Sequence, residues 1–269
     1  MSTDKSAMKE TISDFGSQWT RFDDIDSGYY GREILFDDIL KPLVAAEDVA
    51  GKVVADIGSG TGRIVRMLAS AGAAKIFAIE PSEAISVLRR NVAGIRQIEC
   101  LHVDGASLPC EPALDWVFSI GVIHHIPDAK QVMSSCFRAL KPRGRVAIWL
   151  YGREGNELYL CFVLPLRRVL RCCPDLMLTA LSWFAVPMLR MYGWACRWMS
   201  LPMRTYFVGH ISKLSSRQVM VTVFDQLNPA YAKYYTKSEA IELLEQSGFV
   251  DVQVHHRHGY SWTVVGRKP

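Results

Sequence analysis

The stretch "VVADIGSGTGRIVRMLA", residues 53–69, decides the fold. It begins with an apolar run that reaches Asp56, continues with glycine at every second position from 58 to 62, and then places apolar residues at helical spacing. A strand, a glycine-rich turn and a helix in this order are typical of a site for a nucleotide-like ligand. A dinucleotide-binding turn would have its third glycine at position 63, which is Arg63, and the lysine of a nucleoside triphosphate site is missing. The stretch therefore predicts a nucleotide-like ligand of another kind.

Apolar runs alternate with helical patterns along the rest of the chain. The expected strands are 52–56, 75–80, 98–103, 114–121 and 144–150, and the expected helices are 62–72, 81–92, 128–140 and 236–249. Two further strands, 250–256 and 260–268, follow and are joined by the turn "RHG". Strands that alternate with helices predict an α/β fold, in which helices cover both faces of a doubly wound, mostly parallel sheet.

The composition is that of a folded globular protein. Of the 269 residues, 49% are hydrophobic and 22% are charged, and the formal net charge of +4 is too small to indicate a nucleic-acid partner. None of the seven cysteines forms a C-x-x-C pair, which disfavours a zinc ribbon and favours reduced thiols. The polar N-terminus, "MSTDKSAMKETISDFG", lacks the apolar core of a signal peptide. We therefore expect an intracellular, cytoplasmic protein.

Three acidic residues end three neighbouring strands. Asp56, Glu80 and Asp104 follow the first, second and third expected strands, so they meet at one edge of the sheet. A carboxylate at Glu80 suits the two hydroxyls of a ribose, and one at Asp104 suits the exocyclic amine of adenine. Such a pocket repels a pyrophosphate and favours a cation. Alternatively, Asp56 caps a helix N-terminus and Asp104 serves turn chemistry alone.

These residues resemble the class I S-adenosylmethionine-dependent methyltransferases. The motifs that carry the resemblance are "VADIGSGTGR" (54–63), "AIEPS" (78–82), "VDGASLP" (103–109), "FSIGVIHHIPD" (118–128) and "ALKPRGRVAIW" (139–149). The resemblance implies a Rossmann-like, seven-stranded sheet with an antiparallel last strand at "YSWTVVG", and S-adenosyl-L-methionine as cofactor. The cofactor-binding residues that it implies are Asp56, Gly58, Ser59, Gly60, Gly62, Glu80, Pro81, Asp104, Gly105, Ala106, Ser119 and Ile120.

The segment after the fourth strand faces the methyl group in this fold. Here it reads "SIGVIHH" (119–125), without the proline-rich, Asn- or Asp-led tetrapeptide of enzymes that methylate nucleobase amines. Nucleic acid is therefore disfavoured as a substrate. His124 and His125 are candidates for a general base, because histidine titrates near neutral pH. The alternative is that one of them packs beneath the cofactor.

We expect three regions. Residues 1–48 form an N-terminal lid, residues 49–152 and 236–269 form the cofactor-binding core, and residues 153–235 form a helical cap. In the lid, Trp19 is placed to stack over the cofactor and Arg32 to meet its carboxylate, although either residue can instead be a packing residue.

The cap segment 158–207 is rich in tryptophan, methionine and arginine, has no lysine, and contains one acid, Asp175. Its longest charge-free stretch, 176–189, is too short to span a membrane. Either the cap packs on itself over the active site, or its arginine and tryptophan residues make peripheral contact with an anionic membrane at its inner face.

Two segments near the C-terminus have open interpretations. The stretch "VFDQLNPAYAKYYT" (223–236) either lines the acceptor pocket or forms a turn with packed tyrosines. The candidate substrate residues in it are Asp225, Gln226, Asn228, Tyr231 and Tyr235. His256 and His258 lie on one face of a strand, but no third ligand is evident, so a hairpin tip is favoured and no metal site is predicted.

The resemblance implies an enzyme that transfers a methyl group to a small-molecule or lipid-linked acceptor. The favoured acceptor atom is a hydroxyl, as in a saccharide or polyketide. The alternatives are carbon methylation of a quinone-like lipid and a non-catalytic cofactor-binding module that docks a partner. The sequence leaves the oligomeric state open.

Overall fold

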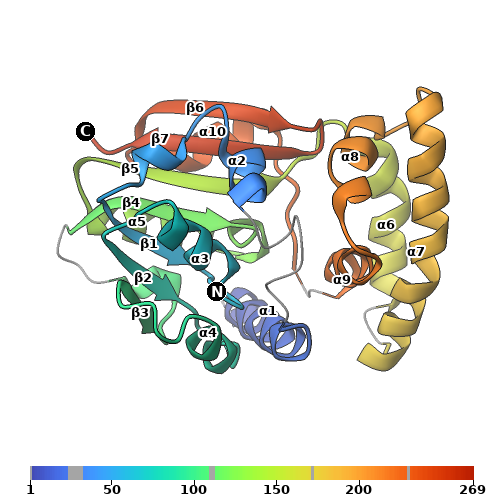
Figure 1. Ribbon diagram of the computed structural model, residues 1–269, viewed down its shortest axis with the longest axis horizontal. Coiled ribbons are helices and arrows are strands. Elements are labelled where there is room, and N and C mark those ends of the chain that lie inside the picture. Colours follow the sequence, from blue (N-terminus) through green and yellow to red (C-terminus); the bar gives the residue numbers. More distant parts are fainter. Residues whose placement is uncertain (1, 24–32, 109–112, 171–172, 229–230) are drawn as a thin grey trace.

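The computed structural model describes residues 2–23, 33–108, 113–170, 173–228 and 231–269. A seven-stranded sheet with the order β3-β2-β1-β4-β5-β7-β6 forms its centre (Figure 1). The strands are β1 (Val53–Ile57), β2 (Lys75–Ile79), β3 (Ile98–Leu101), β4 (Leu114–Ile120), β5 (Leu140–Tyr151), β6 (Val250–Arg257) and β7 (Ser261–Arg267). The pairs among β1 to β5 are parallel, and β7 is antiparallel to both β5 and β6. The predicted sheet is confirmed, including its antiparallel last strand.

Helices cover both faces of this sheet. On one face, α5 (Ala129–Ala139) and α10 (Lys237–Glu245) pack on a core that includes Met133, Ile148 and Leu244. On the other face, α2 (Glu33–Leu40), α3 (Arg63–Ser70) and α4 (Ile85–Asn91) share a core with Phe118. Capping side chains fix where α5 and α10 begin, since Asp128 accepts from the Gln131 amide and Thr236 accepts from the Glu239 amide.

Several predicted boundaries differ from the structure, and the contacts explain two of them. The helix expected from residue 81 begins only at Ile85, because Ser82 is held by hydrogen bonds to Glu80 ahead of the helix. The strand expected from residue 144 begins at Leu140, where it already pairs with Leu114 before a register shift.

A helical insertion between β5 and α10 forms a separate layer, at the right in Figure 1. It contains α6 (Glu157–Leu170), α7 (Asp175–Trp198), α8 (Arg204–Gly209) and α9 (Ser216–Leu227). Its own core includes Val186, Phe207 and Phe224, and Phe22 joins it at the end of α1 (Ser2–Arg21). Helix α1 thus contacts the insertion, with the Phe22 and Phe224 rings 5.3 Å apart. Among the described helices, none is long and apolar enough to cross a membrane.

Candidate functional site

A cavity of about 270 Å³ opens at the carboxyl ends of the parallel strands. Its walls come from the loops after β1, β2 and β4, from α1, and from the insertion. This is the edge at which an open parallel sheet places its ligand. The cavity is continuous and has two halves, a cofactor end at the loops after β1 and β2 and an acceptor end at the insertion.

The glycine loop after β1 leaves room that only glycine allows. Gly58 has a φ of +72°, and a Cβ there would lie 2.5 Å from a methyl group of Val122. Gly60 has a φ of +52°, and a Cβ there would lie 3.5 Å from the Trp19 ring. Both residues line the cavity, whereas Gly62 packs against Leu88 at the start of α3. The loop therefore presents backbone to the cavity, with Trp19 placed over it.

Glu80 organises the same loop. Its Oε2 accepts a hydrogen bond from the Gly60 amide at 2.7 Å, and its Oε1 accepts from the amide and hydroxyl of Ser82 at 3.0 and 2.5 Å. Each carboxylate oxygen has two lone pairs. One acceptor position on Oε2 therefore remains for a ligand, which fits a ribose hydroxyl.

Asp56 is a buried acid behind this loop. It is 2% exposed and does not line the cavity, and its Oδ2 has no hydrogen-bond partner among the described residues. Burial raises the pKa of Asp56 to about 7, and the Glu80 carboxylate raises it further, against the hydrogen bond with Ser59. Asp56 therefore lies behind the glycine loop as a buried acid that keeps a proton more readily than an exposed one.

The other predicted cofactor residues are divided between the cavity and its surroundings. Those that line it are Trp19, Ser59, Pro81, Asp104, Gly105 and Ile120. Asp104 also caps the short turn after β3 by accepting from the Ala106 amide at 2.9 Å, and Ala106 itself faces away. The Ser119 hydroxyl donates to the Ile57 carbonyl in the sheet. Arg32 lies outside the described residues. The residues at this end fit the cofactor that the resemblance implies.

His125 stands where the two ends of the cavity meet. Its Nδ1 lies 2.9 Å from the Tyr231 carbonyl oxygen, which can only accept, so Nδ1 carries the proton and Nε2 keeps its lone pair. Burial lowers the pKa of His125 to about 4, and the Asp225 carboxylate opposes that shift. His125 is therefore a neutral hydrogen-bond acceptor at pH 7.

His124 faces the other way. It is fully buried and absent from the cavity wall, and its ring stacks on Tyr151 with centroids 3.8 Å apart. Neither of its ring nitrogens has a hydrogen-bond partner among the described residues. Burial lowers the pKa of His124 well below its ordinary value. The geometry favours His125 over His124 for contact with an acceptor.

A polar network defines the acceptor end. Asp225 accepts from Gln18 at 2.8 Å and from the Tyr151 hydroxyl at 2.9 Å. Gln226 donates to the Tyr151 hydroxyl at 2.8 Å and accepts from Tyr159 and Tyr234, each at 3.0 Å. Burial raises the pKa of Tyr151 well above its ordinary value, so this hydroxyl stays protonated. The network therefore offers fixed donors and acceptors beside His125.

The predicted substrate residues lie partly elsewhere. Asp225 and Gln226 line the cavity, whereas Asn228 donates to Gln18 outside it. Tyr231 contributes the carbonyl that holds His125, and Tyr235 is buried in the core. The sequence argument missed Tyr151, Tyr159 and Tyr234, which line the cavity instead. The density of tyrosines in 223–236 was a signal for Tyr234, but not for the other two.

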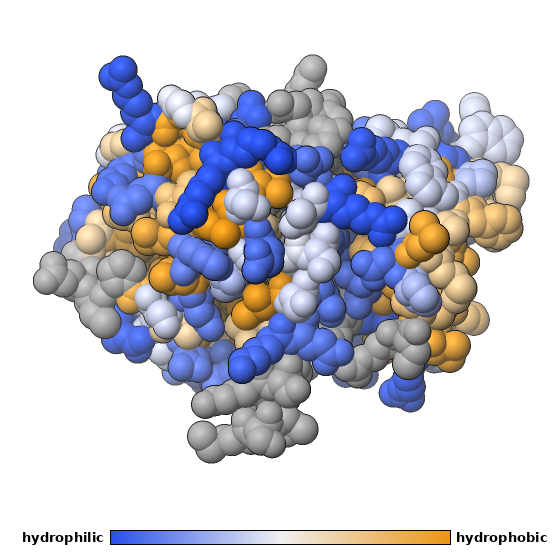
Figure 2. Space-filling model, turned by 90° about the horizontal axis from the view of Figure 1, so that it is seen from below, coloured by the Kyte–Doolittle hydropathy of each residue, from blue (hydrophilic) through white to orange (hydrophobic). Residues whose placement is uncertain are grey.

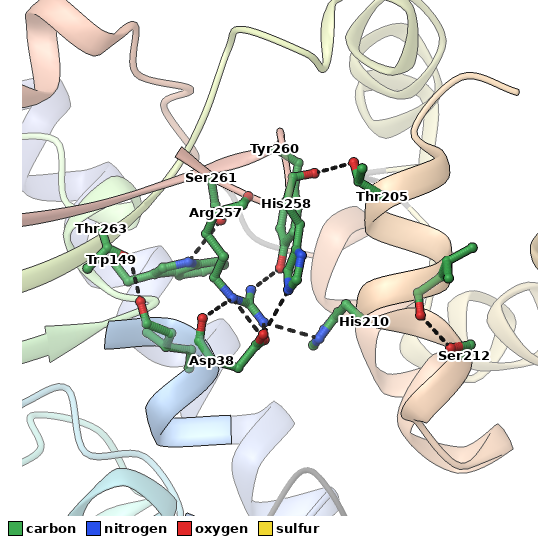
Figure 3. A network of polar contacts seen from close by, with 12 residues as sticks. Asp38, Trp149, Thr205, His210, Ser212, Arg257, His258, Tyr260, Ser261 and Thr263 are labelled. Atoms are coloured by element: carbon green, nitrogen blue, oxygen red, sulfur yellow. Dashed lines mark hydrogen bonds and ion pairs between the residues drawn. The ribbon is translucent and has the colours of Figure 1, made fainter. Parts of the chain in front are cut away.

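The far wall of the cavity contains a buried ion pair (Figure 3). Arg257 at the end of β6 pairs with Asp38 of α2, and its Nη2 lies 3.4 Å from Nδ1 of His210. His258 also contacts Asp38, at 2.8 Å, and its carbonyl accepts from Thr205 of α8. The network joins α2, the β6–β7 hairpin and the insertion.

This arrangement bears on the two histidines of the hairpin. His258 contacts Asp38, and His256 stacks on Trp262 with centroids 4.0 Å apart. Within the described ranges, no group of three or more His, Cys, Asp or Glu side chains could hold a metal ion. The structure thus gives both histidines structural contacts.

Comparisons with known proteins agree with this geometry. A family model described as a methyltransferase domain matches residues 55–148. Demethylmenaquinone methyltransferase from Clavibacter sepedonicus is 30% identical over 129 residues, which cover 45% of this chain and 53% of that protein. Ubiquinone biosynthesis O-methyltransferase from Neisseria meningitidis serogroup A is 30% identical over 133 residues, which cover 47% of this chain and 55% of that protein. The chain thus spans about half the length of these curated relatives.

Solved structures share the fold at low identity. Magnesium protoporphyrin IX methyltransferase from Synechocystis PCC 6803, with bound S-adenosylmethionine, is 15% identical with a TM-score of 0.54, and the match covers 99% of this chain and 97% of that one. Human N-acetylserotonin methyltransferase, also in complex with S-adenosylmethionine, is 14% identical with the same TM-score of 0.54. The match covers 94% of this chain and 56% of that one. Residues 55–148 therefore match a methyltransferase domain, and the fold of the chain is shared with methyltransferases whose solved structures contain S-adenosylmethionine.

Proposed function

We propose that this protein transfers a methyl group from S-adenosylmethionine to a hydroxyl of a small or lipid-linked molecule, such as a saccharide or polyketide. One observation carries the proposal. The glycine loop with Glu80 and the polar network with Asp225 open into the same cavity, and His125 lies where they meet. A cavity of this kind holds donor and acceptor in line, which supplies most of the catalysis in methyl transfer.

The cofactor supplies an electrophilic methyl group on a sulfonium when it is bound. The chain's own residues do the remaining work. Gly58 and Gly60 let the backbone approach the cofactor, Trp19 covers it, and Glu80 accepts from its ribose. His125 Nε2 accepts the hydrogen bond of the acceptor hydroxyl and orients a lone pair of its oxygen. The nearby Asp225 carboxylate favours a positive charge on His125 as the hydroxyl proton moves to it.

The first test is transfer of a labelled methyl group. Purified protein and methyl-labelled S-adenosylmethionine are incubated with a lipid extract and, separately, with a water-soluble metabolite extract. The proposal expects a labelled product whose methyl is bound to oxygen, and expects its formation to fall in Glu80→Ala because the cofactor is held less tightly. Calorimetry of both proteins with the cofactor alone separates loss of binding from loss of transfer.

A second candidate function is carbon methylation of a quinone-like lipid. The acceptor end is lined by aromatic rings, among them Trp149, Tyr151, Tyr159 and Tyr234, which suit a flat ring. The names of two curated relatives refer to menaquinone and ubiquinone chemistry. A labelled methyl that resists the cleavage of methyl ethers would favour this candidate over the first.

We further propose a cytoplasmic location with peripheral contact at the inner face of the membrane, where a lipid-linked acceptor is found. In this proposal residues 1–48 act as a lid and residues 153–235 as the substrate cap, supported by the positions of Trp19, Tyr159 and Asp225 in the cavity wall. A non-catalytic cofactor-binding module is the contrasting outcome: tight cofactor binding with no transfer to either extract.

A further inference from the structure

Helices α6 and α7 expose an unusually apolar surface. Six large side chains on them define what is called here the outer face: Phe162, Val169, Leu176, Phe184, Trp194 and Trp198. Their exposed fractions are 70, 73, 76, 69, 64 and 78%. Figure 2 shows apolar residues gathered at the right-hand end of the molecule, where Figure 1 places these two helices. Contiguous apolar surface of this kind marks an interaction site.

The spacing along α7 makes the outer face continuous. Leu176, Trp194 and Trp198 of the outer face recur at helical intervals, and Trp183 and Met191, which lie between them along the same side, are also exposed. The opposite side of the same helix, which includes Leu178, Val186 and Cys196, is buried against the insertion core. A helix that is apolar on both sides is usually covered on both sides. Among the residues that the structure describes, none covers the outer side of α7.

The charges beside the outer face indicate which kind of partner covers it. Arg168 and Arg197 lie on α6 and α7 and are both exposed. In residues 158–207 the chain has no lysine and a single acid, Asp175. A second copy of this chain would bring arginine toward arginine with almost no carboxylate to pair with them. An anionic bilayer supplies phosphates for the arginines, an apolar phase for the helix face and an interface that tryptophan prefers.

The outer face is close in sequence to the acceptor end of the cavity. Tyr159 of α6 lines the cavity, while its neighbours Leu158 and Phe162 are exposed. Met203, which follows α7, also lines the cavity. Helix α6 and the segment that follows α7 thus contribute to the cavity wall next to the apolar surface, which suits an acceptor that arrives from a lipid phase.

We propose that the outer face of α6 and α7 docks the protein on an anionic lipid bilayer, with both helices lying in the interface. Docking itself requires only this surface. Its link to a lipid-linked acceptor rests on the proposed function.

The test is flotation of the full chain with two kinds of vesicle, pure phosphatidylcholine and an equimolar mixture of phosphatidylcholine and phosphatidylglycerol, at low and high salt. The proposal expects binding to the mixed vesicles that salt weakens, and much weaker binding to the neutral ones. R168E/R197E should lower the partition coefficient on mixed vesicles by roughly thirtyfold or more. Each basic residue near an anionic surface raises that coefficient by roughly fivefold, and the substitution also adds two repelled carboxylates.

The matched control is R96E/R138E, which makes the same change of charge at two exposed arginines of the sheet domain. It should retain most of the binding. W194S/W198S should lower binding to the mixed vesicles by on the order of tenfold and leave the remaining binding sensitive to salt. Calorimetry with S-adenosylmethionine should give the same affinity for all variants, which shows that each is folded.

Three results would overturn docking. The first is no binding to the mixed vesicles. The second is an equal loss of vesicle binding in R168E/R197E and R96E/R138E. The third is a protein that does not bind vesicles and forms a dimer in sedimentation velocity, where W194S/W198S abolishes the dimer. If any of these results is found together with methyl transfer to a water-soluble acceptor, the docking proposal is wrong and the proposed methyl transfer still holds.

Discussion

The cofactor end of the cavity is made of short loops that follow neighbouring strands, whereas the acceptor end is assembled from side chains of separate segments. Gly58 and Glu80 directly follow β1 and β2, and Asp104 comes three residues after β3, so the sheet alone brings them together. Gln18, Tyr151, Tyr159 and Asp225 belong to α1, β5, α6 and α9, and only the packing of the insertion brings them together. A site whose residues follow the strands of a sheet can be predicted from local sequence, whereas a site that tertiary packing assembles cannot.

The largest effect is expected from Gly58→Ala at the cofactor end. The new Cβ would lie 2.5 Å from Val122 in a backbone conformation with φ +72°. We expect the free energy of unfolding to fall by about 2–4 kcal/mol, the sum of strain and overpacking, and cofactor binding to fall by at least about a hundredfold. Urea unfolding and calorimetry measure the two effects.

Gly51→Ala is the matched control for this prediction. Gly51 has nearly the same φ, +71°, but nothing lies within 4 Å of its added Cβ. It should cost about 1 kcal/mol of stability and leave cofactor affinity unchanged. Equal loss of affinity in both variants would mean that the loop responds to strain anywhere in the fold, and not to contact with the cofactor.

A second prediction separates the two neighbouring histidines. His125→Asn removes the Nε2 acceptor at the junction of the two ends and should lower kcat by about a hundred- to a thousandfold with little change in cofactor affinity. His124→Phe replaces a buried ring that does not line the cavity and whose nitrogens have no well-formed hydrogen bond to any described residue, so it should retain activity and equal or exceed the wild-type stability. Assays of labelled methyl transfer measure the activities of both variants, and thermal unfolding measures their stabilities. The opposite order of activities would move the acceptor contact to His124.

A third prediction concerns the pH dependence of the protein without cofactor. The pKa of Asp56 is about 7 in the folded chain, against 3.8 ordinarily, so the folded state keeps a proton that the unfolded state has lost. Stability should therefore fall as pH rises from about 4 to 7, and Asp56→Asn should raise the free energy of unfolding at pH 8 by on the order of 2–4 kcal/mol. Urea unfolding at pH 5 and pH 8 tests both points.

Asp115→Asn should change the free energy of unfolding in the opposite direction from Asp56→Asn. The hydrogen bonds from Lys141 and Val53 hold the pKa of Asp115 below its ordinary value. Its carboxylate stabilises the fold above about pH 4 and loses that contribution as pH falls, so Asp115→Asn should destabilise the protein at pH 8. If both substitutions destabilise at pH 8, burial of Asp56 does not strain the fold.

The smallest expected effect distinguishes two adjacent tyrosines. Tyr234 lines the cavity and donates to Gln226, whereas Tyr235 is 3% exposed and belongs to the core. Tyr234→Phe should raise KM for the acceptor by about three- to tenfold through one lost hydrogen bond, and Tyr235→Phe should leave it within about twofold. A larger effect in Tyr235→Phe would restore the sequence-based assignment.

These two tyrosines also show why the acceptor end could not be predicted fully. In an extended segment successive side chains point to opposite sides, so a shift of one residue exchanges cavity for core. The bridge between Tyr235 and Gly152 fixes which side each tyrosine takes, and it joins residues that are far apart in the sequence. Nothing in 223–236 alone determines that pairing.

The sheet could be predicted because its pattern is local. Strand and helix alternate, with clear caps at Asp128 and Thr236, and the antiparallel last strand follows from the resemblance to a known family. In the insertion, by contrast, apolar residues lie on both sides of α7, and hydrophobic spacing alone does not tell the buried side from the exposed one. The exposed side became evident only in the structure.

The central claim is that both ends of one cavity serve a single methyl transfer through His125. The most direct test incubates wild-type protein, His125→Asn and His124→Phe with methyl-labelled S-adenosylmethionine and a lipid extract, and counts label in the organic phase. We expect a labelled, oxygen-bound methyl with wild type and His124→Phe, and a loss of about a hundredfold or more with His125→Asn. Tight cofactor binding by all three proteins, with no label transferred to lipid or to water-soluble molecules, would contradict it.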